Sequence, residues 1–214
     1  MYKRQVEWLA HHGLEGSVVE NRPLPPFADE KKPPENGWTV GYIGRVRDIR
    51  SFELLVEAVK TIPAFERPKL RVAGDGTAAS KVRTLLMSEV EAGTIEAEVS
   101  GAFSQSELPE LLQSVDVMYA MYSPQRGNVL QGALPVKVFD AASGGVPSVV
   151  NAGCLMADVV VSENIGAHAP WGDAESVGQA LRSLRDTVAE LAATGEREHQ
   201  RWLSAMNPVL EVLQ

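Results

Sequence analysis

The chain has 214 residues, of which 44% are hydrophobic and 22% charged, a composition typical of a globular protein. Its net charge of −8 repels phosphate backbones, which argues against duplex nucleic acid as a main partner and requires a local positive pocket for any anionic ligand. A single cysteine, Cys154, excludes an intramolecular disulfide framework and favours a reducing compartment. We expect a cytoplasmic protein, because no apolar run reaches the roughly 20 residues that cross a bilayer and the N-terminus lacks the apolar core of a secretion signal.

The first 37 residues differ in pattern from the rest of the chain. Tyr2 to His12 predicts a short helix that Gly13 ends, and Gly16 to Glu20 predicts a short strand. Five of the 13 prolines then fall between Asn21 and Asn36. Proline fixes φ and has no backbone donor, so this stretch is expected to be a semi-rigid connector, and we place a boundary there.

From residue 38 onward, short apolar strand patterns alternate with amphipathic helix patterns. The predicted strands are Trp38–Ile43, Leu70–Ala73, Ile95–Val99, Asp116–Ala120, Ser148–Val150 and Ile165–Ala169. The predicted helices are Ser51–Ile62, Thr77–Glu91, Ser104–Ser114, Pro135–Ser143, Asp173–Ala193 and Glu196–Met206. This alternation is typical of an α/β fold, a doubly wound, Rossmann-like parallel sheet of about six strands with helices on both faces and a helical C-terminal segment. Such sheets bind ligands at the carboxyl ends of their strands.

Three helix starts carry recognisable signals. Thr77 is expected to cap the second helix of this region with its hydroxyl. Ser104 and Glu107 have the spacing of a capping box. Pro135 suits the first position of the helix that follows the long polar loop from Tyr122 to Leu134.

The loop after the first predicted strand is rich in arginine. Arg45, Arg47 and Arg50 lie within six residues, just before a helix. Guanidinium groups match phosphate oxygens, and a helix N-terminus adds backbone donors. The loop therefore predicts a diphosphate clamp; the alternative is a solvated basic turn whose arginines pair with Asp48 and Glu53.

The loop after the second predicted strand reads Gly74-Asp75-Gly76-Thr77-Ala78-Ala79 and matches the G-x-G-x-x-A dinucleotide fingerprint. Glu96 and Glu98 lie about 20 residues further on, where a ribose-binding acid is expected. A nicotinamide-dependent oxidoreductase domain is therefore one interpretation. The match is weak, because the fingerprint belongs after the first strand of such a fold, and the alternative is a tight turn that uses the φ freedom of glycine.

The helix predicted to start at Pro135 carries Lys137 in its first turn and Asp140 one turn later, on nearly the same face. A cation there can hold a phosphate with help from the helix dipole, and the carboxylate can accept two hydrogen bonds from a ribose diol. The spacing suits a nucleotide diphosphate along the helix start. The alternative is a Lys137–Asp140 surface pair, which is worth little.

Other common sites are not indicated. The four histidines have no zinc-site spacing, and neither a nucleophile elbow nor a Walker lysine motif is found. Cys154 is expected to be a small packing residue.

Taken in order, these loops resemble the C-terminal half of group 1 glycosyltransferases with the GT-B fold, over about residues 38 to 190. Gly44-Arg45 followed by Arg50 resembles the donor-phosphate motif, with arginine where lysine is usual. The family's strand ending in Gly-Asp-Gly and its base-binding turn are similar to Leu70–Gly76 and Val99–Phe103. The segment with the second acid of the two-glutamate motif is similar to Lys137–Pro147.

The resemblance implies a transferase that moves a sugar from a UDP- or GDP-linked donor to a hydroxyl acceptor, with retention at the anomeric carbon. It implies catalytic roles for Arg45 and Arg50 on the diphosphate, ribose binding by Asp140, and nucleobase binding by the backbone around Phe103. Because arginine charge stabilises the leaving diphosphate, no cofactor and no metal are expected. The donor-binding residues expected from the resemblance are Gly44, Gly74, Asp75, Gly76, Phe103, Ser123, Arg126, Gly127, Asn128, Lys137 and Asp140.

Two departures from the family pattern stand out. The first acid of the pair corresponds to Gly132, so Asn128 or Gln131 is expected to substitute for it. The acceptor-binding half is missing: residues 1–37 resemble the tail of that domain plus a linker, 38–192 the nucleotide-sugar-binding domain and 193–214 a C-terminal helix. The expected partner is therefore an N-terminal acceptor-binding domain or a separate subunit, which would also make any contact with the inner face of a membrane. A catalytically silent nucleotide-sugar-binding subunit is a further alternative.

Overall fold

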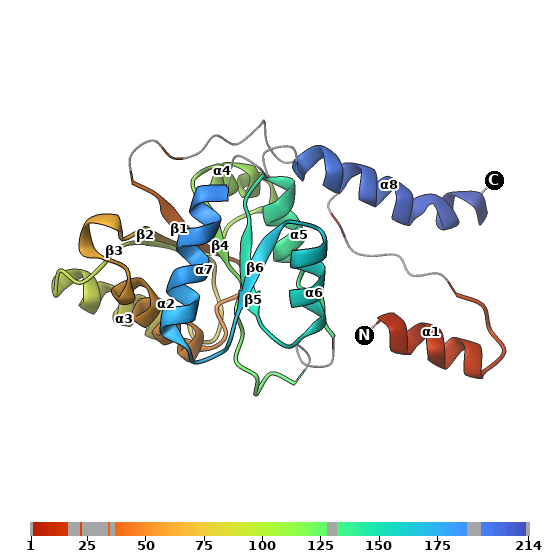
Figure 1. The fold of residues 1–214 in the computed structure, drawn as a ribbon, viewed down its shortest axis with the longest axis horizontal. Coiled ribbons are helices and arrows are strands. Elements are labelled where there is room, and N and C mark those ends of the chain that lie inside the picture. Colours follow the sequence, from red (N-terminus) through yellow and green to blue (C-terminus); the bar gives the residue numbers. More distant parts are fainter. Residues whose placement is uncertain are drawn as a thin grey trace.

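The computed structural model describes residues 2–16, 22, 34, 37–127, 132–187 and 194–212. Within them, one sheet contains six strands in the order β3-β2-β1-β4-β5-β6, and all neighbouring strands are parallel. The strands are β1 (Thr39–Ile43), β2 (Lys69–Ala73), β3 (Glu96–Ser100), β4 (Val117–Tyr119), β5 (Ser148–Asn151) and β6 (Gly166–Ala169). The doubly wound parallel fold predicted from the sequence is confirmed (Figure 1).

The helices are α1 (Tyr2–His11), α2 (Ile49–Thr61), α3 (Ala79–Glu91), α4 (Leu108–Gln113), α5 (Val136–Ser143), α6 (Leu155–Ser162), α7 (Ala174–Thr187) and α8 (Thr194–Val212), with 3-10 turns η1 (Ala64–Glu66) and η2 (Gln105–Glu107). Helices α2 to α7 cover the two faces of the sheet, whereas α1 lies apart from it (Figure 1). The sequence pattern did not predict α6: it is apolar on nearly all sides and holds three consecutive valines, so it lacks helical periodicity. The strand predicted for Gly16–Glu20 lies almost wholly outside the described residues.

The core has two layers because side chains along each strand alternate between the two sheet faces. Val40 and Tyr42 of β1 join the cluster formed with α2, α3 and α7. Ile43, the next residue, joins the cluster on the other face, against α4 and α5. A third cluster packs α6 and α5 against β4 and β5.

The strand order places a topological switch point between β1 and β4. From β1 the chain moves outward to β2 and β3 and then crosses back to β4 on the other side of β1. The loops that leave the carboxyl ends of β1 and β4 therefore diverge and leave a crevice between them, where sheets of this kind bind ligands.

The loops after β1 and β2 are joined by backbone hydrogen bonds. Gly44 N donates to Ala73 O (2.9 Å), Val46 N to Asp75 O (3.0 Å) and Ala78 N to Val46 O (3.1 Å). The expected Thr77 cap is wrong: Ala78 is the N-cap of α3 and no side chain caps this helix end. The amide of Ala78 donates to the neighbouring loop at Val46 O, and the first amide of the helix, Ala79 N, donates to Gly76 O.

Glycine makes this close approach possible. A Cβ added to Gly74 would lie 1.9 Å from Gly44 O, and one added to Gly76 would lie 2.2 Å from Val46 O. Both glycines also have φ values, +146° and +156°, that side-chain-bearing residues rarely adopt. The two glycines are therefore needed to hold the loops together.

The other helix starts agree closely with the sequence. The capping box between Ser104 and Glu107 is present and opens η2, from which α4 continues. Pro135 lies at the N-cap of α5, one position before the helix. Asp48 caps α2 by accepting from Arg50 N, which starts this helix two residues earlier than predicted.

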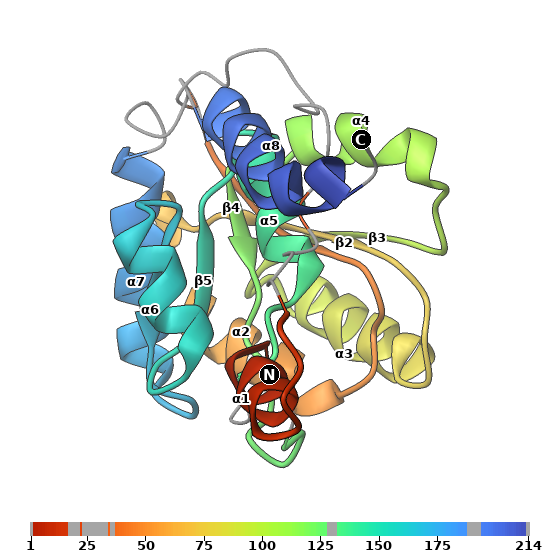
Figure 2. The same cartoon turned by 90° about the vertical axis from the view of Figure 1, so that its right-hand side faces the viewer.

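A buried ion cluster fastens α8 to the sheet domain. Arg22 contacts Glu163 at 2.7 Å and Glu198 at 2.8 Å, and Arg201 contacts the same carboxylates at 3.0 and 2.5 Å. The guanidinium of Arg22 also lies 4.2 Å from the ring centroid of Phe139 in α5, and Figure 2 shows α8 lying across α5. Arg22, although it precedes the expected boundary at residue 37, is thus buried in this domain.

We predict that Gly76→Ala lowers the free energy of unfolding by at least about 2 kcal/mol, because its methyl group would overlap Val46 O in a backbone conformation unfavourable for alanine. Denaturant unfolding measures the change. Gly101→Ala is the control: an added Cβ meets no atom within 4 Å there, so the expected change is within about 0.5 kcal/mol. Equal unfolding midpoints for the two variants would contradict the role given to Gly76.

Candidate functional site

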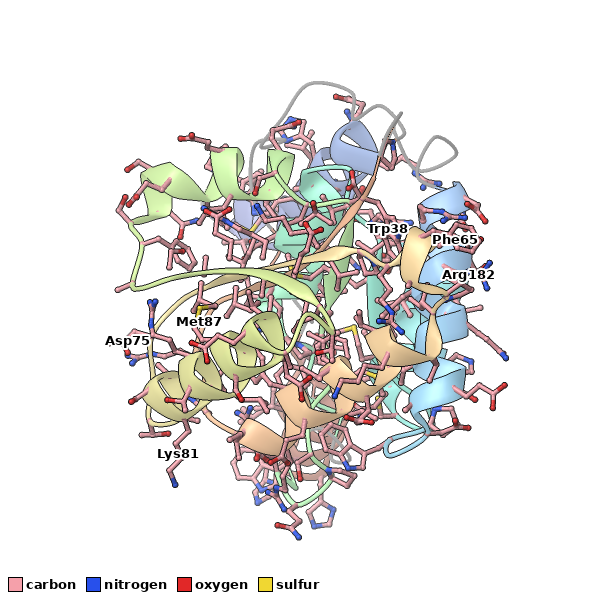
Figure 3. The ribbon with its side chains drawn as sticks, turned by 90° about the vertical axis from the view of Figure 1, so that its left-hand side faces the viewer. Trp38, Phe65, Asp75, Lys81, Met87 and Arg182 are labelled. Carbon is pink, nitrogen blue, oxygen red and sulfur yellow. The ribbon has the colours of Figure 1, made fainter. Side chains whose placement is uncertain are left out.

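A pocket opens at the carboxyl edge of the sheet, beside the switch point. It has a volume of about 230 Å³ and is lined by Ile43, Gly44, Arg45, Phe103, Gln105, Leu108, Leu112, Met118, Lys137 and Asp140. A second hollow of about 330 Å³ shares Gly44, Arg45 and Phe103 with it and adds Gly74, Asp75 and Ala102. Figure 3 shows Asp75 at this edge of the molecule and Trp38, next to the start of β1, on the opposite side. Five expected site residues, Gly44, Arg45, Phe103, Lys137 and Asp140, therefore line one pocket.

Lys137 and Asp140 reach this pocket from consecutive turns of α5. The ammonium nitrogen of Lys137 is buried and has no hydrogen-bond partner among the described residues. Burial alone shifts the pKa of Asp140, with no contribution from a paired charge. The alternative of a Lys137–Asp140 surface pair is therefore wrong: both groups face the pocket without neutralising each other.

Aromatic rings surround the Lys137 ammonium. Its nitrogen lies 3.5 Å from the ring centroid of Tyr42 and 5.5 Å from that of Tyr122. A Cβ at Gly44 would lie 3.4 Å from the lysine Cε, at van der Waals distance, so Lys137 packs directly beside this glycine. Cation–π attraction replaces only part of the lost hydration. Burial, aided by the charge of Arg126, lowers the pKa of Lys137 to about 7.

Burial has the opposite effect on the carboxyl group, raising the pKa of Asp140 to about 6. Desolvation disfavours whichever form is charged, so the pKa values of the lysine and the aspartate move toward each other. Both groups of the pocket thus change charge close to neutral pH. Perturbed groups of this kind, gathered in a cleft, are characteristic of functional sites.

Further cations surround the pair of tyrosines. Arg126 stacks 5.2 Å from the ring centroid of Tyr122, and the Tyr42 hydroxyl donates to Arg45 O at 2.7 Å. Burial raises the pKa of Tyr42 to about 12, while Arg126 and Arg47 act in the opposite direction. An acidic protein thus has a local positive region at this edge, which an anionic ligand requires.

Arg50, one of the two arginines expected to be catalytic, does not line the pocket. Its guanidinium makes a two-point contact with Asp48, at 3.0 and 2.8 Å, and donates to Gln125 Oε1 at 2.6 Å. This bond lowers the pKa of Asp48. The pairing of Arg50 with Asp48 is the solvated-turn alternative drawn from the sequence, whereas Arg45 lines both pockets.

The loop after β4 contributes differently from what was expected. Ser123 is buried; its carbonyl accepts from Arg126 N (2.9 Å) and its Oγ from Gln125 N (3.3 Å). Ser123 therefore shapes the turn that carries Arg126. Ser123 itself lines neither pocket. Gly127 is exposed. Asn128 and Gln131, the expected substitutes for the missing acid, lie outside the described residues, and Gly132 is buried with φ +84°.

The dinucleotide fingerprint has a structural explanation of its own. Gly74 and Asp75 line the second hollow, but Gly76 packs on Val46 and the first amide of α3 is used by the chain itself. Glu98 pairs with Lys69 at 3.1 Å and with Arg71. The helix start and the acid that a dinucleotide would need are thus occupied, which removes the support for the oxidoreductase alternative.

Several pocket residues carried no recognisable signal in the sequence. Leu108, Leu112 and Met118 read as core positions, and Tyr42, whose ring contacts the Lys137 ammonium but does not line the pocket, reads as a strand residue. Gln105 follows the base-binding turn but belongs to no motif. Among the described residues, no group of three or more metal-ligating side chains was found.

A family model for glycosyl transferases group 1 matches residues 37–187, so the chain belongs to this family. The resemblance drawn from the ordered loops is thereby confirmed.

A search of curated proteins gave no match. No helix in the described part of the chain combines the length and apolar character needed to span a bilayer.

Solved structures share the fold at low sequence identity. Sucrose-phosphate synthase from Thermosynechococcus elongatus aligns with a TM-score of 0.71 at 15% identity, covering 100% of this chain and 56% of that one. HepE from Anabaena, in complex with UDP and glucose, aligns at 0.69 and 14% identity, covering 99% and 61%. The C-terminal domain of LpcC from Francisella tularensis, a group 1 glycosyl transferase, aligns at 0.60 and 13%, covering 82% and 95%. The chain thus spans little more than half of the first two and nearly all of the isolated C-terminal domain.

We predict that Lys137→Met stabilises the protein by about 1 kcal/mol at pH 6, because a thioether packs against aromatic rings without the desolvation cost of an ammonium. In the wild type Lys137 is charged in both the folded and the unfolded state below pH 7, so the full desolvation cost of the ammonium lowers stability there. This cost declines as pH rises further, because the folded state then releases a proton that the unfolded state keeps. The gain is therefore smaller at pH 9.

Denaturant unfolding at the two pH values tests this prediction. Lys81→Met on α3, whose side chain points to solvent (Figure 3), is the control and should change little. A Lys137→Met protein less stable than wild type at pH 6 would show that the ammonium stabilises the fold.

Proposed function

We propose that this chain is the donor-binding part of a glycosyltransferase and binds a nucleoside diphosphate sugar in the pocket at the switch point. One observation carries the proposal. An ammonium and a carboxylate, both unpaired among the described residues, face one pocket from α5, and Arg45 lines the same pocket. A ligand that is anionic at one point and donates hydrogen bonds at another satisfies both groups.

The diphosphate is assigned to Arg45, Lys137 and the backbone at Gly44, which line the same pocket, with Lys137 packed beside Gly44. Guanidinium and ammonium groups there provide charge-assisted hydrogen bonds to phosphate oxygens. Arg126, which lies over the Tyr122 ring, adds positive charge to the region assigned to the diphosphate. The geometry supports Arg45 in the role expected of both arginines and does not support Arg50.

The nucleoside is assigned to the rest of the pocket. Asp140 accepts hydrogen bonds from the ribose hydroxyls, which favour its charged form. The nucleobase lies against Phe103 and the apolar side chains of Leu108, Leu112 and Met118, with Gln105 at the polar edge. This fit holds for either a UDP-linked or a GDP-linked donor.

In the proposed reaction, the bond between the anomeric carbon and the diphosphate oxygen breaks, and its electron pair leaves with the diphosphate. The acceptor hydroxyl forms the new bond to the anomeric carbon and passes its proton to an oxygen of the leaving diphosphate. Arg45 and Lys137 stabilise the charge that develops on the leaving group. No cofactor is assigned, and retention at the anomeric carbon is part of the proposal.

The acceptor is proposed to bind to another domain or subunit. The chain spans 56% and 61% of two similar glycosyltransferase chains, and the domain boundary proposed at residue 38 lies one residue from the start of the family match. We propose a cytoplasmic location, with any membrane contact made through the acceptor-binding part.

Titration calorimetry with UDP, GDP and NAD tests the proposed function. Binding of UDP or GDP with no response to NAD is expected, together with no sugar transfer by this chain alone. NAD binding without a response to either nucleoside diphosphate would overturn the proposal.

We predict that Arg45→Ala weakens binding of the preferred nucleoside diphosphate by about 2 kcal/mol, roughly 30-fold, because a charge-assisted contact to phosphate is lost. Arg50→Ala should change the affinity less than about threefold, since Asp48 already engages this guanidinium. Calorimetry on both variants makes the comparison. Equal losses would return Arg50 to the site.

We predict that the affinity for a nucleoside diphosphate sugar is highest between pH 6 and 7. The bound diphosphate favours the Lys137 ammonium, so affinity falls as pH rises above about 7. The ribose favours the Asp140 carboxylate, so affinity also falls below about pH 6.

UDP-glucose, or the GDP-linked sugar if GDP is preferred, is the suitable probe, because a diphosphate diester has no second phosphate ionisation in this range. Lys137→Met should remove the alkaline decline and Asp140→Asn the acid decline. A flat profile for the wild type would remove both residues from the ligand contact.

A further inference from the structure

Two buried side chains hold the segment that follows β4, and neither lines the pocket. Ser51 of α2 donates its hydroxyl to Met121 O at 2.8 Å. From β5, Asn151 Nδ2 donates to Tyr122 O, and Tyr122 N donates to Asn151 Oδ1, both at 2.8 Å. Each side chain belongs to a residue that is only 5% exposed. The main chain at residues 121 and 122 is therefore fixed from both sides.

The Asn151 amide continues the sheet beyond its last backbone pair. Ala120 N donates to Val149 O at 2.9 Å, and past this bond β4 and β5 no longer pair. The side-chain amide then offers Tyr122 one donor and one acceptor, as a neighbouring strand would. Exchanging the amide oxygen and nitrogen would set donor against donor, so the contacts define the orientation of Asn151.

The clamped segment leads directly to the charged part of the site. The Tyr122 ring lies 5.5 Å from the Lys137 ammonium and 5.2 Å from the Arg126 guanidinium, measured to its centroid. The next residue, Ser123, begins the turn that presents Arg126. A shift of the Tyr122 backbone would therefore move the ring away from Lys137 and Arg126 together.

We infer that Asn151 and Ser51 are positioning residues of the donor site, which act by holding Tyr122 against Lys137. They touch no ligand themselves. The inference rests on the proposed function, because its effect is measured as donor affinity. Small displacements of charged groups weaken a preorganised site strongly, so their supports contribute to binding.

The test uses Asn151→Leu, Asn151→Asp and Ser51→Ala in the full chain, with UDP-glucose, or the GDP-linked sugar if GDP is preferred, as the probe. Asn151→Leu removes both bonds to Tyr122 and should lower affinity about tenfold. Asn151→Asp keeps the acceptor but sets an oxygen against Tyr122 O, and should also lower affinity. Ser51→Ala should have a smaller effect in the same direction. Ser162→Ala, which removes a similar hydroxyl bond to Val159 O on α6, is the control and should bind as wild type does.

A double-mutant cycle separates positioning from general stability. Tyr122→Ala removes the ring and leaves the backbone groups that Asn151 binds. In that background Asn151→Leu should lower the thermal midpoint as before but cause no further loss of affinity. The alkaline decline in affinity should also move to higher pH in Asn151→Leu alone, because Lys137 becomes better solvated.

Two results would overturn the inference: wild-type affinity in Asn151→Leu, or losses that simply add in the double variant. If Asn151→Leu does not fold, the same cycle is run with Ser51→Ala, and independent losses there have the same meaning. A wild-type protein that binds none of the nucleotides contradicts the proposed function instead, so the two failures are distinguishable.

Discussion

The site depends on the burial of one ammonium group between two tyrosine rings. Lys137 packs beside Gly44, and its nitrogen has no hydrogen-bond partner in the part of the chain that is described. A cation in this state is costly, and the tyrosine rings offset only part of the cost. Such a cost is typical of groups kept for binding rather than for folding. The partner that relieves it is the anion assigned to the pocket.

The sheet order explains why that ammonium meets its neighbours. Because β1 and β4 are adjacent while their following loops diverge, Arg45 from the loop after β1 and Lys137 from the helix that follows the loop after β4 line one pocket. The glycines after β2 draw the second loop onto the first and help to form the wall beside Arg45. The proposed donor site is thus a product of strand order, and its walls are loops held by backbone hydrogen bonds.

Much of this arrangement can be predicted from the sequence, because it depends on patterns between residues close together in the chain. The structure agrees with three short-range patterns: the strand and helix periodicity, the Ser104–Glu107 capping box, and the placement of Lys137 and Asp140 on one helix face. The partner of the Arg50 guanidinium could not be predicted from such a local pattern. Sequence offers both phosphate and Asp48 as partners, and the capping geometry of α2 favours Asp48. Tyr42, Tyr122 and Asn151 were missed because each resembles an ordinary strand or loop residue until the strands are placed side by side.

The ion cluster of Arg22, Glu163, Glu198 and Arg201 affects how the chain can be divided. Each carboxylate contacts both arginines, and Glu198 is completely buried. Removing one member of a buried group leaves an uncompensated charge, which costs more than the intact group contributes. A fragment trimmed to the family-matched residues 37–187 would lose Arg22, Glu198 and Arg201 together and leave Glu163 alone. The two flanking segments are therefore best regarded as a matched pair, to be retained or removed jointly.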